Sequence, residues 1–264
     1  MTVIALTSFD LVMAAGLVLI LAVLSWFMHL GIERNLIIAA ARTVVQLLLV
    51  GLVLKILFQY AQLGWTVVVA VVMLLFAGRE VMARQTYRLK GWWGYGVGTS
   101  SMFISTFSIT VLVLILIVNV KPWYMPQYSI TLLGMMLGNT MNGIALAMDR
   151  LMHSAWQQRQ TIEAKLLLGY TGSEAVADIR HESMRTGMIP MINAMAAAGL
   201  VSLPGMMTGQ ILSGTPPMEA VKYQILIMFM ITAGTGFGTL TAVWISTRRL
   251  FDDRHRLHLE RLRH

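Results

Sequence analysis

The sequence predicts an all-α fold, that of a polytopic integral membrane protein. Of the 264 residues, 57% are hydrophobic and only 12% are charged, whereas a soluble domain carries about 25% charged residues. The mean hydropathy is +0.70, and the apolar residues run in blocks close to the ~20 residues that a helix needs to cross a bilayer. No polar stretch is longer than residues 149–187, so we expect a single transmembrane domain over residues 1–264.

We expect about seven transmembrane helices. In chain order they are Leu11–Leu30, Ile37–Phe58, Trp65–Val81, Val97–Val120, Ile130–Met148, Met188–Leu203 and Tyr223–Thr247. No basic segment precedes the first, which is therefore expected to be a retained span and not a cleaved signal. The sixth is short and rich in alanine. The segment after it, residues 203–212, is too apolar for a free loop and too rich in glycine for a stable helix. It is either a re-entrant outer gate or a tight connection at the outer face.

Basic residues orient the chain in the membrane. Sixteen of the twenty lysines and arginines fall in the first, third and fifth loops and beyond Thr247. Because basic loops stay in the cytosol, the N-terminus is expected outside and the C-terminus in the cytosol. The net charge of +8 then reflects topology and gives no reason to expect a nucleic-acid partner. We expect the tail after residue 247 to continue the last helix along the inner surface, near anionic lipid. Contact of the tail with the ATPase is the alternative.

The long polar stretch contains a pattern of its own. Glu163, Ala164 and Lys165 precede Gly169 by the interval of a short helix, and Ile179 follows ten residues after the glycine. Gly169 can adopt positive φ and end that helix. Thr171 and Glu174 have capping-box spacing and would begin the next helix.

This spacing resembles the cytosolic loop by which permeases of ABC transporters dock onto a separate ATPase. His181 and Glu182 depart from that pattern, since a Leu-Pro pair usually closes it. The resemblance implies that Glu163, Ala164, Lys165, Gly169, Thr171 and Glu174 contact the ATPase. The alternative is an ordinary helical connection between two spans.

Three further segments resemble the FetB-like ABC transporter permease family. They are Ala41–Leu47, Gly134–Asn139 and Gly199–Leu212, the last followed by Lys222-Tyr223-Gln224. The resemblance implies a homodimeric permease in the inner (plasma) membrane, paired with a cytosolic ABC ATPase that carries the ATP and magnesium. Bacterial members are implicated in iron export, and plant members in aluminium tolerance and UDP-glucose transport. The chain has no G-x-x-x-x-G-K-[ST] phosphate loop, so it is not expected to be an enzyme or to hold a cofactor.

Polar residues within the spans are the candidates for a substrate path. Arg42 and Gln46 lie one turn apart in the second span, and Asn139 and Asn142 share the fifth. Each could line a path or make a structural hydrogen bond, and for Arg42 the expected partners are backbone carbonyls. Gly134 and Gly138 are spaced for close helix contact. Met206, Met207 and Gln210 would belong to the outer gate.

A stand-alone channel or secondary carrier remains the rival to an ABC permease. The carboxylates lie at the ends of the expected spans, and there is no cysteine. The acids that a proton-coupled carrier uses at membrane depth are therefore missing. The same pattern predicts no metal-binding site, although the methionines are soft ligands.

Overall fold

The computed structural model describes residues 7–252 and 254–263, most of which are helical. The long helices are α1 (Ser8–Phe27), α2 (Glu33–Tyr60), α3 (Leu63–Ala83), α6 (Pro126–Gln157), α9 (Ala177–Ala197) and α11 (Pro217–Leu250). The shorter elements are α4 (Trp92–Met102), η1 (Phe103–Phe107), α5 (Ser108–Leu112), η2 (Val113–Val118), α7 (Arg159–Leu167), α8 (Gly172–Ala175), α10 (Gly205–Leu212) and η3 (Leu259–Arg261). Strands β1 (Arg88–Leu89) and β2 (Leu262–Arg263) form one antiparallel pair.

Six of the seven expected spans are confirmed as helices long and apolar enough to cross a membrane. Five of these are α1, α2, α3, α6 and α11. The remaining one is the continuous helical segment of residues 92–118, in which the π-helical turns η1 and η2 interrupt the α-helix. These six helices make the chain a multi-pass membrane protein.

The expected span that is not among the six apolar helices is the sixth, Met188–Leu203, which corresponds to α9 and begins eleven residues earlier than expected. Its first half carries Asp178, Arg180, Glu182 and Arg185, which lower its mean hydropathy. Pro190 lies in its interior and not near its start. The helix nevertheless packs along α6 and α11, so its position follows from protein contacts more than from hydropathy.

Helices α6, α9 and α11 cross closely at glycines. A Cβ atom added to Gly187 of α9 would lie 2.6 Å from the carbonyl oxygen of Gly143 in α6. The expectation that α6 approaches another helix of the chain closely at Gly134 and Gly138 was wrong. A Cβ at Gly138 would meet nothing within 4 Å, and one at Gly134 would meet only the end of the Met73 side chain. The correct pair could not be found from α6 alone, because the second glycine lies on another helix.

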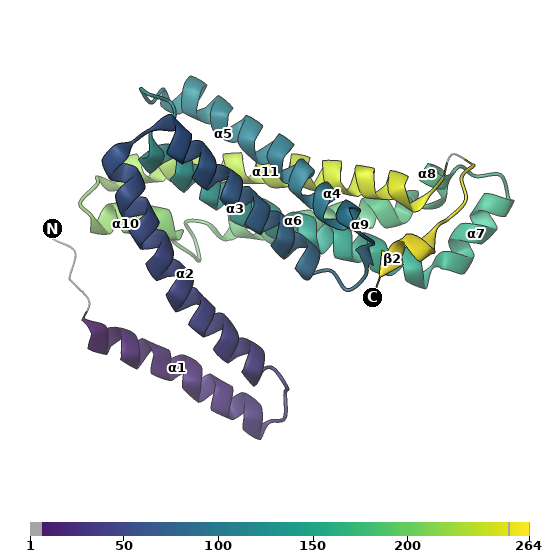
Figure 1. Cartoon of the computed structure of the whole chain (residues 1–264), viewed down its shortest axis with the longest axis horizontal. Coiled ribbons are helices and arrows are strands. Elements are labelled where there is room, and N and C mark those ends of the chain that lie inside the picture. The colour runs from purple at the N-terminus through teal and green to yellow at the C-terminus, as the bar shows by residue number, and fades with distance from the viewer. Residues whose placement is uncertain (1–6, 253, 264) are drawn as a thin grey trace.

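Helices α1 and α2 form a hairpin that stands away from the rest of the chain (Figure 1). We call this part, residues 8–60, the hairpin, and residues 63–263 the body. None of the most apolar window of α2 is buried, against 56% of that of α6. The hairpin meets the body near the end of α2, where Leu57 is buried and Leu54 packs against the main core.

Residues 203–212 and the tail both differ from expectation. The glycine-rich segment does form a helix, α10, which lies against α11 at the end of the molecule opposite α7 and α8 (Figure 1). The tail does not continue α11, which ends at Leu250. It folds back, so that β2 pairs with β1 and the Lys90 amide donates to the Arg261 carbonyl at 2.7 Å. Burial of Phe251 and Leu262 accounts for the return of the chain.

Candidate functional site

Helices α7 and α8 form a compact projection, which we call the knob (residues 159–176). Gly169 has φ +92°, and the Tyr170 amide donates to the Lys165 carbonyl at 3.2 Å, which closes the end of α7. The Thr171 hydroxyl and the Glu174 carboxylate complete the expected capping box at the start of α8. The local structure expected for this segment is therefore confirmed. Hydrogen bonds from the Thr171 amide and hydroxyl lower the pKa of Glu174 below its usual value.

The tip of the knob exposes apolar side chains. Leu167 is 90% exposed and Leu168 is 78% exposed, while Tyr170 is exposed beside them. Ile162 and Val176 are buried beneath and hold the tip in place. Large exposed apolar groups of this kind mark an interaction surface when they stand in water.

The charged residues of the knob differ from each other. Glu163 is exposed, and within residues 7–252 and 254–263 no hydrogen bond or ion pair to it is observed. Lys165, expected to be equally accessible, is half-buried and its ammonium lies 3.1 Å from the Asp178 carboxylate of α9. Ala164 is exposed next to Glu163. Glu163 is therefore an exposed acidic group that the knob can offer to a partner.

The knob stands beyond the length of a bilayer. Helix α6 has 32 residues and is about 48 Å long at 1.5 Å per residue, whereas the hydrocarbon core is about 30 Å thick. The knob, β1, β2 and the tail all gather at one end of α6 (Figure 1). This end is rich in charged side chains, so we expect it to be the end of α6 that reaches water.

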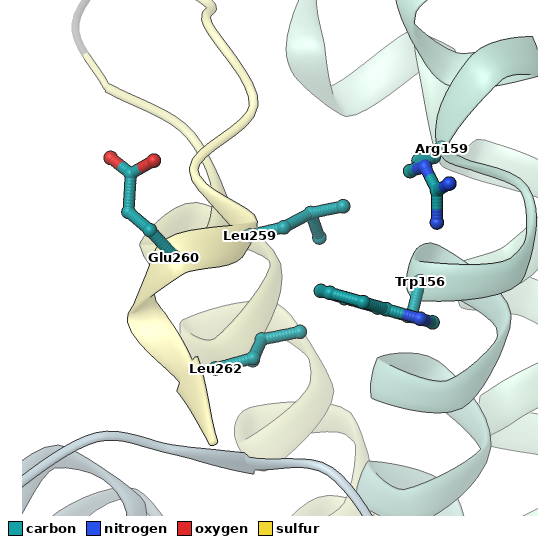
Figure 2. A pocket seen from close by; sticks show the side chains of 5 residues that line it. All are labelled: Trp156, Arg159, Leu259, Glu260 and Leu262. Atoms are coloured by element: carbon teal, nitrogen blue, oxygen red, sulfur yellow. The ribbon is translucent and has the colours of Figure 1, made fainter. Parts of the chain in front are cut away.

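The tail packs against the knob. A Cβ added to Gly172 would lie 2.7 Å from the Phe251 ring, and the Gly172 amide donates to His255 Nδ1 at 3.3 Å. A hollow of about 430 Å³ opens between the tail and the end of α6. In Figure 2, Leu259 and Leu262 point toward the Trp156 ring, whereas Glu260 points away. The tail thus couples the knob to the α3–α4 connection.

Four polar residues of the spans are candidates for a substrate path. Three of them, Arg42, Asn139 and Asn142, lie on or beside one exposed face of α6, which we call the stripe. Asn139 and Asn142 lie on the stripe, and both are exposed in the single chain. The Asn142 side-chain oxygen accepts a hydrogen bond from Arg84, the residue that directly follows α3. Asn139 donates to the Met135 carbonyl of its own helix at 2.8 Å.

Arg42 joins the same region from α2. Its guanidinium lies 3.0 Å from the Glu80 carboxylate, which also lies 4.0 Å from Arg84. Backbone carbonyls were the expected partners of Arg42, and this prediction was wrong. Gln46 lies one turn further along α2 and is exposed in the single chain. Sequence reasoning missed Glu80 and Arg84, although their i,i+4 spacing was a usable signal.

The candidates at the outer gate do not lie near the group formed by Arg42, Glu80, Arg84 and Asn142. Met206, Met207 and Gln210 lie on α10, at the other end of the body (Figure 1). Met206 packs against the apolar cluster around Met136 and Ile231, where a flexible thioether fills space. The side-chain oxygen of Gln210 is buried, and the described residues offer it no hydrogen-bond partner.

Metal-ligating groups do not gather in the part of the chain that the structure describes. No group of three or more histidines or carboxylates lies close enough to hold an ion there. Most of these carboxylates already have partners, such as Arg150 for Glu182 and Lys222 for Glu219.

Residues 8–251 match the uncharacterised protein family UPF0014. The chain belongs to this family. It is 36% identical over 240 residues to a UPF0014 membrane protein of Synechocystis, covering 90% of each chain. It is 30% identical to the probable iron export permease protein FetB of Escherichia coli, over 98% of this chain and 97% of that protein. It is also 30% identical to the protein Aluminum Sensitive 3 of Arabidopsis thaliana, over 92% and 88% of the two chains.

No solved structure matches the chain significantly. The match to the UPF0014 family extends from α1 to the first residue after α11. It therefore includes both the knob and the Arg42–Asn142 region.

Proposed function

We propose that this chain is the membrane permease subunit of an ABC-type exporter in the cell's inner (plasma) membrane. A separate cytosolic ATPase would bind ATP and magnesium and dock on the knob. The observation that carries the proposal is the exposed apolar tip of the knob, with Leu167, Leu168 and the exposed Glu163, at one end of the 32-residue helix α6. Such a tip gains by transfer into a groove of a partner protein.

The orientation supports the same proposal. The knob lies at the end of the molecule that carries the basic loops, which the positive-inside rule assigns to the cytosol. ATP is available on that side. The EAA-like spacing and the basic loops are independent features of the sequence, and they agree.

The cargo proposed is iron or another metal species. The support is the name of the Escherichia coli relative, a probable iron export permease. A nucleotide sugar is the alternative cargo, and a stand-alone channel or secondary transporter is the alternative mechanism. The anionic nucleotide sugar is favoured by one observation, the two arginines beside Glu80. A stand-alone carrier would leave the apolar tip of the knob unexplained.

A homodimer follows from symmetry. A two-fold ATPase dimer presents two identical grooves, so two copies of the knob are needed to fill them. Facing copies would enclose the polar stripe of α6, because Asn139 and Asn142 would lack partners in lipid. In this arrangement Arg42 and Gln46 would line the inner part of the path. Met206, Met207 and Gln210 on α10 would close its outer end.

The knob is tested by a double variant, Glu163→Lys with Gly169→Pro. Proline cannot adopt the φ of +92° observed at residue 169, and the lysine inverts the exposed charge of Glu163. We expect the permease to insert normally but to lose the ATPase on co-purification, with ATP turnover reduced at least tenfold in reconstituted vesicles. ATPase binding and ATP turnover equal to those of the wild-type protein would contradict the docking role.

The matched control is Glu219→Lys. This glutamate is also exposed, makes its ion pair only with Lys222, and lies at the start of α11 at the opposite end of the body. The charge change equals that of Glu163→Lys, so non-specific electrostatics would affect both. We expect the control to retain the ATPase.

A further inference from the structure

A cluster of two arginines and one carboxylate lies where α2, α3 and α6 converge. The Glu80 carboxylate is 3.0 Å from the Arg42 guanidinium and 4.0 Å from that of Arg84. Arg84 in turn donates to Asn142 of α6. Two guanidinium groups share one carboxylate, so the cluster keeps one net positive charge.

The cluster lies near the end of α3, and its arginines are accessible. Asn142 lies seven residues, or about 10 Å of helix, before Asp149 in α6. The Asp149 carboxylate accepts a hydrogen bond from the Thr86 amide of the α3–α4 connection. The Arg42 and Arg84 side chains are 57% and 46% exposed. A charged group that faces lipid is costly, so this face is expected to meet water or another protein surface.

The arginines have donors to spare. A guanidinium carries five N–H donors. One contact joins Arg42 to Glu80, and Arg84 has one partner in Asn142 and a longer contact to Glu80. The remaining donors form the planar fork that recognises carboxylate or phosphate oxygens in pairs.

The same charge balance disfavours a bare cation. A divalent metal ion seeks carboxylate or imidazole ligands. In the part of the chain that the structure describes, no group of three such residues is found. At this cluster the single carboxylate is already shared by two cations, which would repel a third.

We propose that Arg42, Arg84 and Asn142, balanced by Glu80, bind an anionic oxygen group, carboxylate or phosphate, of the transported molecule. A metal cargo would therefore enter as an anionic chelate and not as a free ion. The proposal rests on the proposed function only in identifying the ligand as cargo. The binding site itself can be tested without the ATPase.

The test measures equilibrium binding to the purified full-length chain in maltoside micelles, which carry no phosphate. The probes are radiolabelled citrate, ferric citrate, uridine diphosphate glucose and Fe²⁺ alone. We expect saturable binding of at least one anionic probe, weakened by added KCl. Citrate or ferric citrate alone identifies a carboxylate ligand, and the nucleotide sugar alone identifies a phosphate ligand. Saturable binding of Fe²⁺ alone, with no anionic probe bound, would overturn the proposal.

Charge variants separate a binding site from a structural ion pair. Arg42→Gln and Arg84→Gln should each weaken anion binding about tenfold. Glu80→Gln raises the net charge of the cluster and should strengthen binding. A purely structural network predicts instead that Glu80→Gln leaves binding unchanged or weakens it, and either result would refute the site.

Arg79→Gln is the matched control. Arg79 is an exposed neighbour of Glu80 on α3, and no hydrogen bond or ion pair to it is observed among the described residues. An equal loss of binding in this variant would show a general charge effect and contradict the proposal. Arg42→Lys keeps the charge but loses the fork, so it should fall between wild type and Arg42→Gln. Failure of the wild-type chain to bind the ATPase, with anion binding intact, would overturn the proposed function and leave this inference standing.

Discussion

The hairpin and the body are both built from apolar helices but are held by different forces. The most apolar windows of α1 and α2 both have a mean hydropathy of 2.3, above the 1.3 of α6, yet only 11% and 0% of them are buried. Helix α6 is the central helix of the body, and 56% of its window is buried. In a membrane, lipid covers apolar side chains as well as protein does, so hydropathy drives insertion but not contact.

What fixes the body is shape and polarity. Glycines allow α6, α9 and α11 to approach closely, and beyond the membrane the tail is held by strand pairing and buried leucine and phenylalanine side chains. The hairpin has few such contacts. Apart from its apolar contacts near Leu57, the Arg42–Glu80 pair ties it to the body. The comparison therefore predicts that equal substitutions act differently in the two parts.

The largest difference is expected for glycine-to-alanine changes. In Gly187→Ala the new methyl group would lie 2.6 Å from the Gly143 carbonyl oxygen, and overpacking should destabilise the body by about 3 kcal/mol. In Gly51→Ala of α2 it would meet nothing within 4 Å, and helix propensity should stabilise α2 by about 0.5–1 kcal/mol. Unfolding in detergent, followed by tryptophan fluorescence, measures both. Effects of the same sign and size would break the comparison.

A smaller difference is expected for leucine-to-alanine changes. Leu262 of β2 is 6% exposed and Leu48 of α2 is 66% exposed. Leu262→Ala should cost about 2 kcal/mol, and it should speed hydrogen exchange at the Lys90 amide, which donates to Arg261. Leu48→Ala should leave that amide unchanged. A similar rate in both variants would show that the tail is not held by its buried leucine.

The smallest effect is expected from pH, and only in the body. Hydrogen bonds to Glu260, at 2.6 Å, and to Asp252, at 3.3 Å, raise the pKa of His258 above its usual value. The Arg256 amide and side chain lower the pKa of Asp252, and His258 lowers that of Glu260. The pair of carboxylates therefore stays charged while the histidine titrates.

The sign follows from linkage. A raised pKa means that protonated His258 stabilises the tail fully below the ordinary value of about 6.5, and that this is lost as pH rises through the raised pKa. Exchange at the Lys90 amide, corrected for its intrinsic rate, should therefore speed up above neutral pH. The effect should vanish in His258→Gln, and amides of α2 should not respond. A tail that loosens on acidification would contradict the assignment.

Local features of the knob could be predicted from the sequence. The positive φ of Gly169 and the Thr171–Glu174 capping box depend on neighbours a few residues away. The six apolar helices could be predicted for the same reason, since about twenty consecutive apolar residues are enough to cross a bilayer.

Contacts between distant segments could not be predicted. The sequence pointed to Gly134 and Gly138, but Gly143 of α6 meets Gly187 of α9. It left Lys165 free, but Asp178 binds it. It extended α11 into the tail, but β1 captures the tail more than 170 residues away in the chain.

The sequence by itself determined that this chain spans a membrane, which loops are basic, and where a knob projects, because insertion, topology and helix ends depend on short runs of residues. Only the tertiary structure decided which polar groups meet. Arg42, Glu80, Arg84 and Asn142 come from three helices, and their hydrogen bonds exist only where the helices converge. In lipid, hydropathy does not select partners between helices, so shape and hydrogen bonding across large sequence separations make that choice.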